Sequence, residues 1–560
     1  MDALQPCTVA CIRFGERAHW WDRFPWTQEA ALGAKLKYFF YTDRPVKPEP
    51  QSVYLIYDNW NDWFYWVTQF NVYYVSELGE LHSLGNVKIA RERMIPEGEK
   101  TGEEDFKTNA PELPEKFDSL SDDFFSVGQS ENYYESVRAL PPHIAGAILS
   151  DLRDCAYDLS IFEHFQNHPA MRKSLLRDIG ERHLRERLHE LAVGNTELSQ
   201  FDFSYLFPQP DPFESEVRLT FSVRPLTTPP TNVHAIIGRN GVGKTTLFKG
   251  LIQGVLRKSD SDEPVGKLET PDGNEGWLSN KEYFTALSLV SYSPFDKFGP
   301  MRLTLLPEGV KYSYIGLMKF RDEKSEELTP KSFDELFNDF MRSMESCLQG
   351  IMRDRWHACL EILESDPLFK EAGIASLSSA SERDFIDKSK WQVEVRRLLR
   401  RLSSGHLIIL LIVTRLIEVT EERSLTLIDE PEAHLHPPLI SAFIRAVSYL
   451  MSERNGVAVV ATHSPVVLQE IPASSVWLLN RTGRFISGAR PEGETFGENV
   501  GQLTREIFSH ELLNTGFYRM ISDAVSDADS FEDVDQKFNK QLGGEARALA
   551  RSMVRQKLKP

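Results

Sequence analysis

Short apolar runs alternate with longer amphipathic segments through the second half of the chain. Runs of strand length end near Ile237, Tyr292, Ile428 and Val460, and apolar residues recur at helical intervals between them. Strands that are separated by helices form parallel sheets, with ligands at the carboxyl ends of the strands. The pattern therefore predicts an α/β domain whose site lies where these runs end.

The first half of the chain follows another pattern. Alternating apolar residues over 70–74 and a second apolar stretch over 84–89 flank a turn, and predict a β-hairpin in a small mixed domain. Residues 1–95 are rich in aromatic side chains, which can stack nucleic-acid bases but more often fill a core, and we interpret them as core. Apolar residues at helical spacing predict that 119–200 is mostly helical.

These patterns predict an order of domains along the chain. The order is an aromatic-rich mixed or β domain at 1–95, a polar and acidic linker at 96–118, a helical region at 119–205, the α/β head at 206–510 with a helical insertion at about 305–400, and C-terminal helices at 511–560.

Composition narrows the choice of partners and compartment. The 560 residues are 41% hydrophobic and 26% charged, as in ordinary globular proteins, and the net charge of −18 excludes a polycation. The five cysteines have neither zinc-site spacing nor a paired framework, which favours a reducing compartment. No signal-peptide pattern opens the chain, and the longest apolar run, 407–413, is too short to cross a bilayer. We therefore expect a cytoplasmic protein without a membrane part.

The segment from Val233 to Phe248 reads as a strand, a glycine-rich loop and the start of a helix. Its loop fits G-x-x-x-x-G-K-[ST], in which backbone N–H groups surround phosphates, Lys244 reaches the β- and γ-phosphates, and Thr245 binds Mg²⁺. The flanking strand and helix favour this interpretation over a glycine-rich turn without nucleotide. The nucleotide-binding residues expected here are Gly238, Arg239, Asn240, Gly241, Val242, Gly243, Lys244, Thr245 and Thr246.

Acidic residues and a histidine follow the next two strands. Asp429 and Glu430 end a buried apolar run, where one carboxylate can hold Mg²⁺ and the other can orient or deprotonate a water. We assign Asp429 to the metal with Thr245, and Glu430 to the water. His463 follows a further strand and could contact the γ-phosphate or that water.

Other polar features carry weaker signals. Ser403 and Gly405 lie in LSSGH, which opens a helix and is either an anion-binding turn or an ordinary helix cap. His164 and His168 are four residues apart like metal ligands, but no second motif accompanies them, and we interpret them as surface histidines.

Two groups of basic residues are candidate patches for nucleic acid. Either group can equally pair with acidic neighbours or form a solvated surface, and the sequence leaves these interpretations open. The C-terminal group consists of Arg547, Arg551, Arg555 and Lys559, and the group ahead of LSSGH consists of Lys388, Lys390, Arg396, Arg397, Arg400 and Arg401.

Taken in order, the motifs resemble the ATPase head of ABC-type proteins. The shared segments are the phosphate loop at 238–245, LSSGH at 402–406, LTLIDEPE at 425–432 and ATHSP at 461–465. The resemblance implies an ABC-type P-loop ATPase head, with a mixed β-sheet core and a helical insertion, preceded by an α+β N-terminal region. It also implies ATP and Mg²⁺ as cofactors and head-to-tail pairing of two heads.

In such a pair, Ser403 and Gly405 of one head would face the γ-phosphate held by the other. Glu430 would be the base, Lys244 a catalytic phosphate ligand, and His463 the switch histidine. The chain departs from transporters at His406, where they have glutamine, and at 293–296, where SPFD stands in place of a glutamine-bearing loop.

The sequence DEPEAHLHP, followed by THSP, is similar to the corresponding motifs of OLD-type and SMC-like soluble ATPases rather than to those of transporter cassettes. No nuclease site is recognised, since Asp527 and Asp529 lie in a polar helical stretch. A head without a nuclease, together with TFGENVG at 495–501, resembles the Septu (PtuA) family of bacterial anti-phage defence, including its retron-associated form. That resemblance implies an oligomer with a separate HNH-type nuclease subunit, and contact with DNA or a retron nucleic acid.

The predicted function is an ATP-hydrolysing subunit that senses infection and controls that nuclease. An SMC-like ATPase of DNA repair or chromosome maintenance is one alternative, although no long heptad pattern is present. A scaffold that holds nucleotide with little hydrolysis is another, although Glu430 and His463 argue against it.

Overall fold

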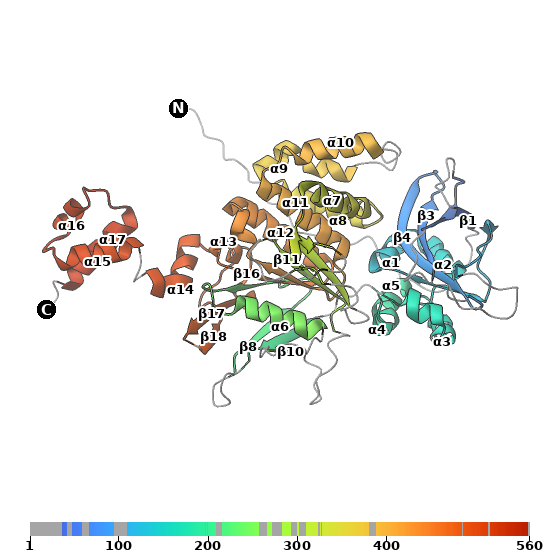
Figure 1. Cartoon of the computed structure of the whole chain (residues 1–560), viewed down its shortest axis with the longest axis horizontal. Coiled ribbons are helices and arrows are strands. Elements are labelled where there is room, and N and C mark those ends of the chain that lie inside the picture. The colour runs from blue at the N-terminus through green and yellow to red at the C-terminus, as the bar shows by residue number, and fades with distance from the viewer. Residues whose placement is uncertain are drawn as a thin grey trace, which may run out of the picture. The chain divides into compact units, whose positions relative to one another are not determined.

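The computed structural model describes most of the chain in two compact units (Figure 1). Unit 1 comprises Met1–Leu175 and Leu184–Thr196, and unit 2 comprises Leu176–His183 and Glu197–Pro560. The described residues are 36–41, 48–58, 66–94, 109–177, 179–195, 198, 200–208, 216–256, 266–270, 283–292, 299–301, 310–322, 325, 327–379, 388–483, 485–512 and 516–557.

Unit 1 is built on a six-stranded sheet of order β5-β1-β2-β3-β4-β6. Strands β3 and β4 pair antiparallel on either side of the predicted turn, so the β-hairpin is confirmed. The strands are β1 (Lys37–Tyr41), β2 (Ser52–Tyr57), β3 (Gln69–Val75), β4 (Leu81–Arg91), β5 (Lys116–Phe117) and β6 (Phe124–Gly128).

Helices follow the sheet in unit 1. They are α1 (Glu131–Arg138), α2 (Pro142–Asp151), α3 (Leu159–Phe165) and α5 (His189–Val193), with π-helical turns η3 (Met171–Leu175) and η4 (Leu184–Leu188), whereas α4 (Glu181–His183) groups with unit 2. This segment is mostly helical, as the spacing of its apolar residues predicts.

The predicted border between a domain at 1–95 and a helical region at 119–205 is corrected by the pairing of the sheet. Strand β6 pairs with β4, and β5, from within the predicted linker, pairs with β1. The two segments therefore share one sheet and one unit. Periodicity predicts that a strand exists but not which distant strand its backbone groups bond to, so unit 1 extends beyond the predicted border.

Aromatic side chains fill the interior of unit 1. Tyr38, Tyr54, Trp66 and Phe70 are each 2% exposed or less. For these residues the interpretation as core is confirmed. The other tryptophans of the first 95 residues, Trp20, Trp21, Trp26, Trp60 and Trp63, lie outside the described residues.

Unit 2 is built on a seven-stranded sheet of order β12-β11-β15-β16-β9-β17-β18. Its strands run parallel except for the antiparallel pair β17–β18. The parallel α/β sheet predicted from alternating strands and helices is confirmed. The strands are β9 (Val233–Ile237), β11 (Ala286–Ser291), β12 (Lys311–Gly316), β15 (Leu425–Asp429), β16 (Val457–Thr462), β17 (Val476–Thr482) and β18 (Phe485–Ala489).

Smaller sheets complete the strands of unit 2. One has the order β10-β7-β8, with β7 (Phe201–Leu206), β8 (Arg218–Val223) and β10 (Lys267–Glu269). The other pairs β13 (Met318–Phe320) with β14 (Leu328–Pro330). Since β7 begins at Phe201, the head starts slightly before the predicted residue 206. The helical part of the predicted insertion begins only after β14.

The helices of unit 2 cover both faces of its main sheet. They are α6 (Lys244–Leu256), α7 (Phe333–Cys347), α8 (Met352–Leu363), α9 (Pro367–Ala372), η7 (Ile374–Ser379), α10 (Lys388–Leu399), α11 (Ser404–Val419), η9 (Pro431–His434), α12 (Pro437–Glu453), α13 (Pro465–Leu468), η10 (Ala473–Ser475) and α14 (Val500–Leu512). The last helices are α15 (Gly516–Ser526), α16 (Phe531–Lys537) and α17 (Gly544–Lys557), which share a small apolar core of their own.

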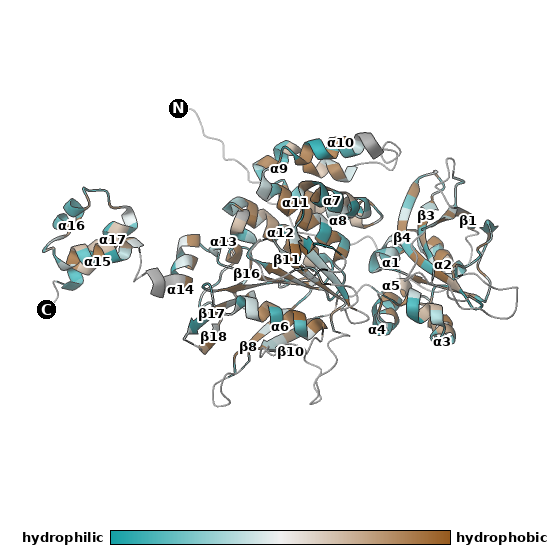
Figure 2. Cartoon of the chain, viewed as in Figure 1, coloured by the Kyte–Doolittle hydropathy of each residue, from teal (hydrophilic) through white to brown (hydrophobic). Residues whose placement is uncertain are grey.

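Strand β9 shows why the sheet has two cores. Its residues Val233, Ala235 and Ile237 pack in the cluster that includes α7, α8, α11 and α12, whereas Ile236 packs in the cluster of α6, β7 and β8. Successive side chains of a strand point to opposite faces, so an unbroken apolar run must be covered on both sides. Figure 1 shows α6 on one face of the sheet and α11 and α12 on the other, and Figure 2 shows hydrophobic residues gathered between the layers.

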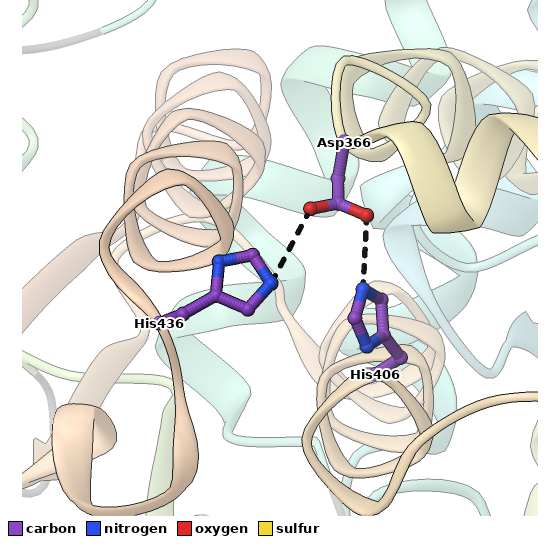
Figure 3. Close-up of side chains that lie close together, drawn as sticks. All are labelled: Asp366, His406 and His436. Carbon is purple, nitrogen blue, oxygen red and sulfur yellow. Dashed lines mark hydrogen bonds and ion pairs between the residues drawn. The ribbon is translucent and has the colours of Figure 1, made fainter.

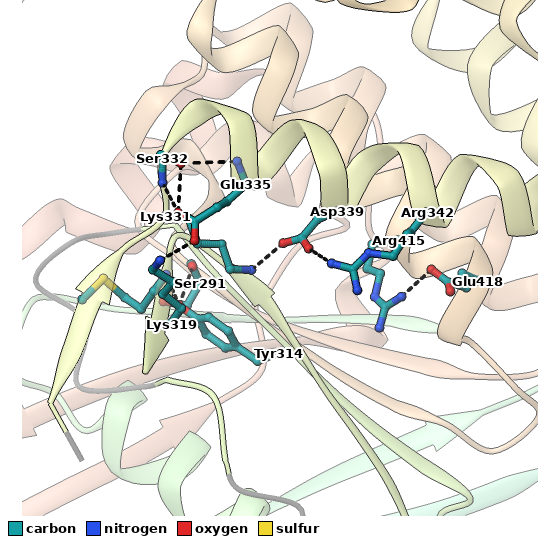
Figure 4. A network of polar contacts seen from close by, with 11 residues as sticks. Ser291, Tyr314, Lys319, Lys331, Ser332, Glu335, Asp339, Arg342, Arg415 and Glu418 are labelled. Atoms are coloured by element: carbon teal, nitrogen blue, oxygen red, sulfur yellow. Dashed lines mark hydrogen bonds and ion pairs between the residues drawn. The ribbon is translucent and has the colours of Figure 1, made fainter. Parts of the chain in front are cut away.

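A chain of ion pairs holds α7 beside the strands that precede it (Figure 4). Ser332 and Glu335 form a capping box at the start of the helix, and the hydrogen bond from Lys319 lowers the pKa of Glu335 to about 2. One turn later, Asp339 accepts from Lys331 at 2.9 Å and from Arg342 at 2.5 Å. Such half-exposed pairs orient the helix more than they stabilise it, because solvent screens them.

In the described part of the chain, no helix combines the length and the apolar character that crossing a membrane requires.

Candidate functional site

The phosphate loop joins the carboxyl end of β9 to the first residue of α6. Gly241 and Gly243 have φ angles of 80° and 116°, which a side chain at Cβ would disfavour. The predicted order of strand, loop and helix is present, with Arg239, Asn240, Thr245 and Thr246 exposed along the loop and the first turn. The positive end of α6 therefore points at an accessible cradle of backbone, as phosphate binding requires.

Lys244 extends back under this loop. The residue is 5% exposed, and its Nζ donates to the carbonyl of Gly238 at 2.9 Å and to that of Arg239 at 3.3 Å. Burial lowers the pKa of Lys244 below its ordinary value, while the nearby carboxylates, Glu430 first among them, oppose the shift. The ammonium group thus lies at the loop, and its carbonyl acceptors are weak neutral partners that a phosphate can replace.

Lys244, His463 and Glu430 lie in mutual contact. The Nζ of Lys244 is 2.6 Å from Nε2 of His463, and the same ring nitrogen is 2.8 Å from Oε1 of Glu430. Lys244 and Glu430 are themselves 3.7 Å apart. One tautomer of His463 accepts from the lysine at Nε2 and the other donates to the glutamate, so the position of one proton decides between the two bonds.

The sheet brings these residues together at one edge. Strands β15, β16 and β9 are neighbours and parallel, and Asp429 pairs in register with Ala461 while Ile237 pairs with Thr462. The residues that follow these strands therefore lie close together. This is the edge where the ends of the apolar runs predicted a site. Asp429 is the last residue of β15 and Glu430 begins the next turn.

The backbone of Glu430 is in the left-handed region, with φ 39° and ψ 59°. Such a conformation is strained for a residue with a side chain, at a cost of roughly 1–3 kcal/mol. It is held by a hydrogen bond of 2.9 Å from the Glu430 N–H to the carbonyl of Ala461, and by Pro431, which starts the following 3₁₀ turn. In this conformation the Glu430 carboxylate lies 2.8 Å from His463 and 3.7 Å from Lys244.

Glu432 is a residue of this site that sequence reasoning missed. Its Oε1 accepts from the hydroxyl of Thr462 at 2.8 Å and also from the backbone N–H of His463. It therefore fixes the turn that carries the histidine. The third carboxylate of the DEPE segment was the available signal, but spacing alone does not show that a side chain two residues beyond Glu430 reaches the next strand.

The LSSGH turn has the geometry of a helix cap. Ser403 is the N-cap of α11, its hydroxyl lies 2.6 Å from Nδ1 of His406, and Gly405 is buried. This agrees with the plainer of the two interpretations of the turn. In a single chain α11 and α6 cover opposite faces of the sheet, so the action of Ser403 and Gly405 on a nucleotide of another head stays a prediction (Figure 1).

Several other predicted features can be placed. Arg396 pairs with Asp334 at 2.6 Å, which favours the salt-bridge interpretation for that basic group, and the guanidinium of Arg551 lies 4.5 Å over the ring of Phe531. His164 is exposed, as expected. The segment 293–296, where transporters carry a glutamine, lies outside the described residues, as does Lys559.

The donors of the site suit a nucleotide with Mg²⁺. Asp429 and Thr245 supply carboxylate and hydroxyl oxygens, the hard ligands that Mg²⁺ takes, and the loop supplies N–H groups and a buried ammonium for phosphates. A parallel sheet with this loop after β9, an acidic pair after β15 and a histidine after β16 defines the class of protein. It is a P-loop ATPase head of the ABC type with an α/β fold.

Comparison with known proteins gives the family. The chain is 35% identical to protein ea59 of Escherichia phage lambda over 529 residues, which cover 90% of this chain and 95% of that protein. The chain belongs to the family of that phage protein. Residues 379–469 also match the family model described as "AAA domain, putative AbiEii toxin, Type IV TA system", a span that holds LSSGH, DEPE and His463.

Solved structures of ABC proteins are among those similar to the chain. One is described as "an inward-facing conformation of a putative metal-chelate type ABC transporter", with 14% identity and a TM-score of 0.28 over 56% of this chain and 90% of that one. Another is an ATP-binding cassette of an ABC transporter in its ADP conformation, with 16% identity and a TM-score of 0.24 over 49% of this chain and 85% of that one.

Proposed function

We propose that this protein binds ATP with Mg²⁺ and hydrolyses it between two heads arranged head to tail. The observation that carries the proposal is the contact of Lys244, His463 and Glu430 at the carboxyl ends of parallel strands, directly beside the phosphate loop. These are a phosphate ligand, a histidine and a carboxylate within reach of one another, which hydrolysis by an activated water requires.

Each group has a role in this proposal. The loop from Gly238 to Thr245 surrounds the phosphates, and Lys244 exchanges its carbonyl acceptors and His463 for phosphate oxygens. Thr245 and Asp429 would hold Mg²⁺, which neutralises charge on the phosphates. Glu430, released from Lys244, orients and deprotonates the water, and His463 contacts the γ-phosphate end.

The second head would complete each site. Ser403 and Gly405 lie at the positive N-terminus of α11, a helix of 16 residues, where an anion is stabilised by the helix dipole and free N–H groups. We propose that this end of one head covers the γ-phosphate held by the other. Binding of ATP would then close the pair and hydrolysis would open it.

The finer proposal is that this cycle controls a separate effector in a defence complex directed against phages, with an HNH-type nuclease as the effector. It is supported by the resemblance to the Septu family, and by the relation of the central segment to a family described by the AbiEii toxin. The family's phage-encoded relative also connects the chain to phage biology. An SMC-like repair ATPase and a nucleotide-bound scaffold are the competing functions.

Substitution of the proposed base tests hydrolysis. Glu430→Gln should keep ATP affinity within a few-fold and slow turnover by at least about 10²-fold, the size of acid–base help that is lost. Turnover is measured as phosphate release and affinity with a fluorescent ATP analogue. Glu453→Gln, at the exposed end of α12, is the matched control and should behave as wild type. Normal turnover in Glu430→Gln would place the base elsewhere, and no turnover in wild type would favour the scaffold.

Native mass spectrometry tests the partner. The chain, purified from its own cells with ATP present, should appear as several copies together with a smaller nuclease subunit. A homodimer that gains no subunit, and that hydrolyses ATP faster when DNA is added, would contradict the defence complex and favour the repair-type ATPase.

A further inference from the structure

Asp366, His406 and His436 form a cluster among the helices of the head (Figure 3). They come from three places in the chain: the N-cap of α9, the first turn of α11 and the residue before α12. One oxygen of Asp366 is 2.9 Å from Nε2 of His406, and the other is 3.6 Å from Nε2 of His436.

The cluster combines buried charge with an open side. The side chains of Asp366 and His406 are 2% and 4% exposed, whereas that of His436 is 52% exposed. Burial acts to raise the pKa of Asp366, but the hydrogen bonds from His406 and from the N–H groups of Leu368 and Phe369 outweigh it, and the pKa lies below its ordinary value. A carboxylate at this depth needs polar partners, and an imidazole lies beside each of its two oxygens.

We propose that Asp366, His406 and His436 bind a divalent transition-metal ion, with Zn²⁺ as the ion that fits best. One carboxylate and two imidazoles are ligands that Zn²⁺ takes, and their ligand atoms all lie within 4.8 Å of one another. Bonds of about 2.0–2.2 Å in a tetrahedron place neighbouring ligand atoms roughly 3.3–3.5 Å apart. The distances of 2.9 Å and 3.6 Å at Asp366 bracket that separation.

The surroundings of the three ligands are those of a built site. Nδ1 of His406 lies 2.6 Å from the hydroxyl of Ser403, which leaves Nε2 to face the ion and fixes the ring. The ring of Phe369 packs edge-on against His406 at 4.8 Å. Oδ1 of Asp366 accepts from the backbone N–H of Leu368 at 2.9 Å, so the carboxylate is oriented as well. Three protein ligands would leave a fourth position for water, and solvent reaches the cluster at the exposed side chain of His436.

A metal ion here has a structural consequence. It joins the segment between α8 and α9 to the starts of α11 and α12, three elements that share one apolar cluster. It also acts on Ser403 through His406, so the metal would set the orientation of the serine hydroxyl. Metal binding itself does not depend on whether the head hydrolyses ATP.

Titration of the full chain with Zn²⁺ tests the site without any nucleotide. The tag-free protein is treated with EDTA, dialysed and titrated by calorimetry, and Co²⁺ is added separately to record its visible absorption. We expect one saturable Zn²⁺ per chain, visible Co²⁺ bands, and a Zn²⁺-dependent rise in Tm. His436→Asn should weaken Zn²⁺ binding at least about 10-fold and weaken the Co²⁺ bands, because it removes a ligand at an exposed position.

The matched control is His357→Asn, a half-exposed histidine of α8 in the same helical region that bonds to Ser378. It should bind Zn²⁺ as wild type does. His406→Asn gives a second test of the cluster, with circular dichroism in EDTA to show that each variant is folded. No saturable Zn²⁺ in the wild type, or equal binding by wild type and a folded His436→Asn, would show that the three side chains form a hydrogen-bonded cluster only and would overturn the proposal.

Discussion

Asp154 in unit 1 and Glu430 in unit 2 are carboxylates at the ends of regular structure, but their neighbours differ. Asp154 is fully buried and accepts from the N–H groups of Ala156 and Tyr157, each at 2.9 Å, and from the hydroxyl of Tyr134. Glu430 is 42% exposed on its side chain, and its carboxylate contacts His463 and Lys244.

The difference distinguishes a carboxylate with a structural role from one whose partners can be exchanged. The partners of Asp154 are mostly backbone N–H groups, from its own turn and from Gly128, and they cannot leave without local unfolding. Burial raises the pKa of Asp154 to about 6. The partners of Glu430 are side chains that rotate at little cost, and solvent reaches the group. A carboxylate held by exchangeable side chains at a sheet edge can take new partners, whereas one held by backbone cannot.

The largest effect is expected when Lys244, an exchangeable partner of Glu430, is removed. Lys244→Ala should weaken ATP binding at least about 100-fold, because a buried ammonium that pairs with phosphate contributes roughly 3 kcal/mol or more. Affinity is measured with a fluorescent ATP analogue. Lys249→Ala, one turn further along α6, is the control and should bind as wild type. ATP affinity that survives Lys244→Ala would refute the phosphate-loop assignment.

A smaller effect is expected for the structural acid. Asp154→Ala leaves buried N–H groups of its turn without an acceptor and should lower the free energy of unfolding of unit 1 by about 3 kcal/mol. It should leave ATP affinity unchanged. Chemical denaturation followed by the tyrosine and tryptophan signal measures the loss. The control is Asp122→Ala, which removes an exposed pair with Arg153 and should cost less than about 1 kcal/mol. If both variants lose the same free energy of unfolding, the buried hydrogen bonds of Asp154 contribute no more to stability than an exposed ion pair.

The smallest effect concerns pH and the buried His234 of β9. Burial lowers the pKa of His234 from 6.5 to about 3, so the folded state binds fewer protons than the unfolded state between these values. Stability is therefore kept above pH 6.5 and lost as the pH falls through that window, by about 2 kcal/mol between pH 6.5 and about pH 5. His234→Phe should be less sensitive to pH over this range, as measured by denaturation at each pH.

His164→Gln, which changes an exposed histidine, is the control for that series and should keep the wild-type slope. If His234→Phe loses as much stability on acidification as wild type does, the slope has another origin.

Much of the fold, and the placement of several site residues, could be predicted from local sequence patterns. The loop from Gly238 to Thr245 could be predicted because its glycines, lysine and threonine act within one turn of backbone. Asp429, Glu430 and His463 could be predicted because parallel strands bring their carboxyl ends to one edge whatever their spacing along the chain. The hairpin of β3 and β4 followed from alternation on both sides of a turn.

Contacts between distant segments could not be predicted in this way. Strand β6 joins β4 beyond the expected domain border, and Glu432 reaches across to Thr462. Asp366 meets His406 across 40 positions of the chain. None of these pairs has a spacing that distinguishes it from other acids, histidines or apolar runs.

The sequence by itself determined where the strands, the phosphate loop and the helices of the head lie, because those properties depend on neighbours along the chain. Only the tertiary structure decided that Lys244, His463 and Glu430 touch, that Glu430 is held in a left-handed conformation, and that Asp366 lies between two histidines. These depend on how helices pack on the sheet, where burial and hydrogen bonding among distant residues select one arrangement from many that the same local patterns allow.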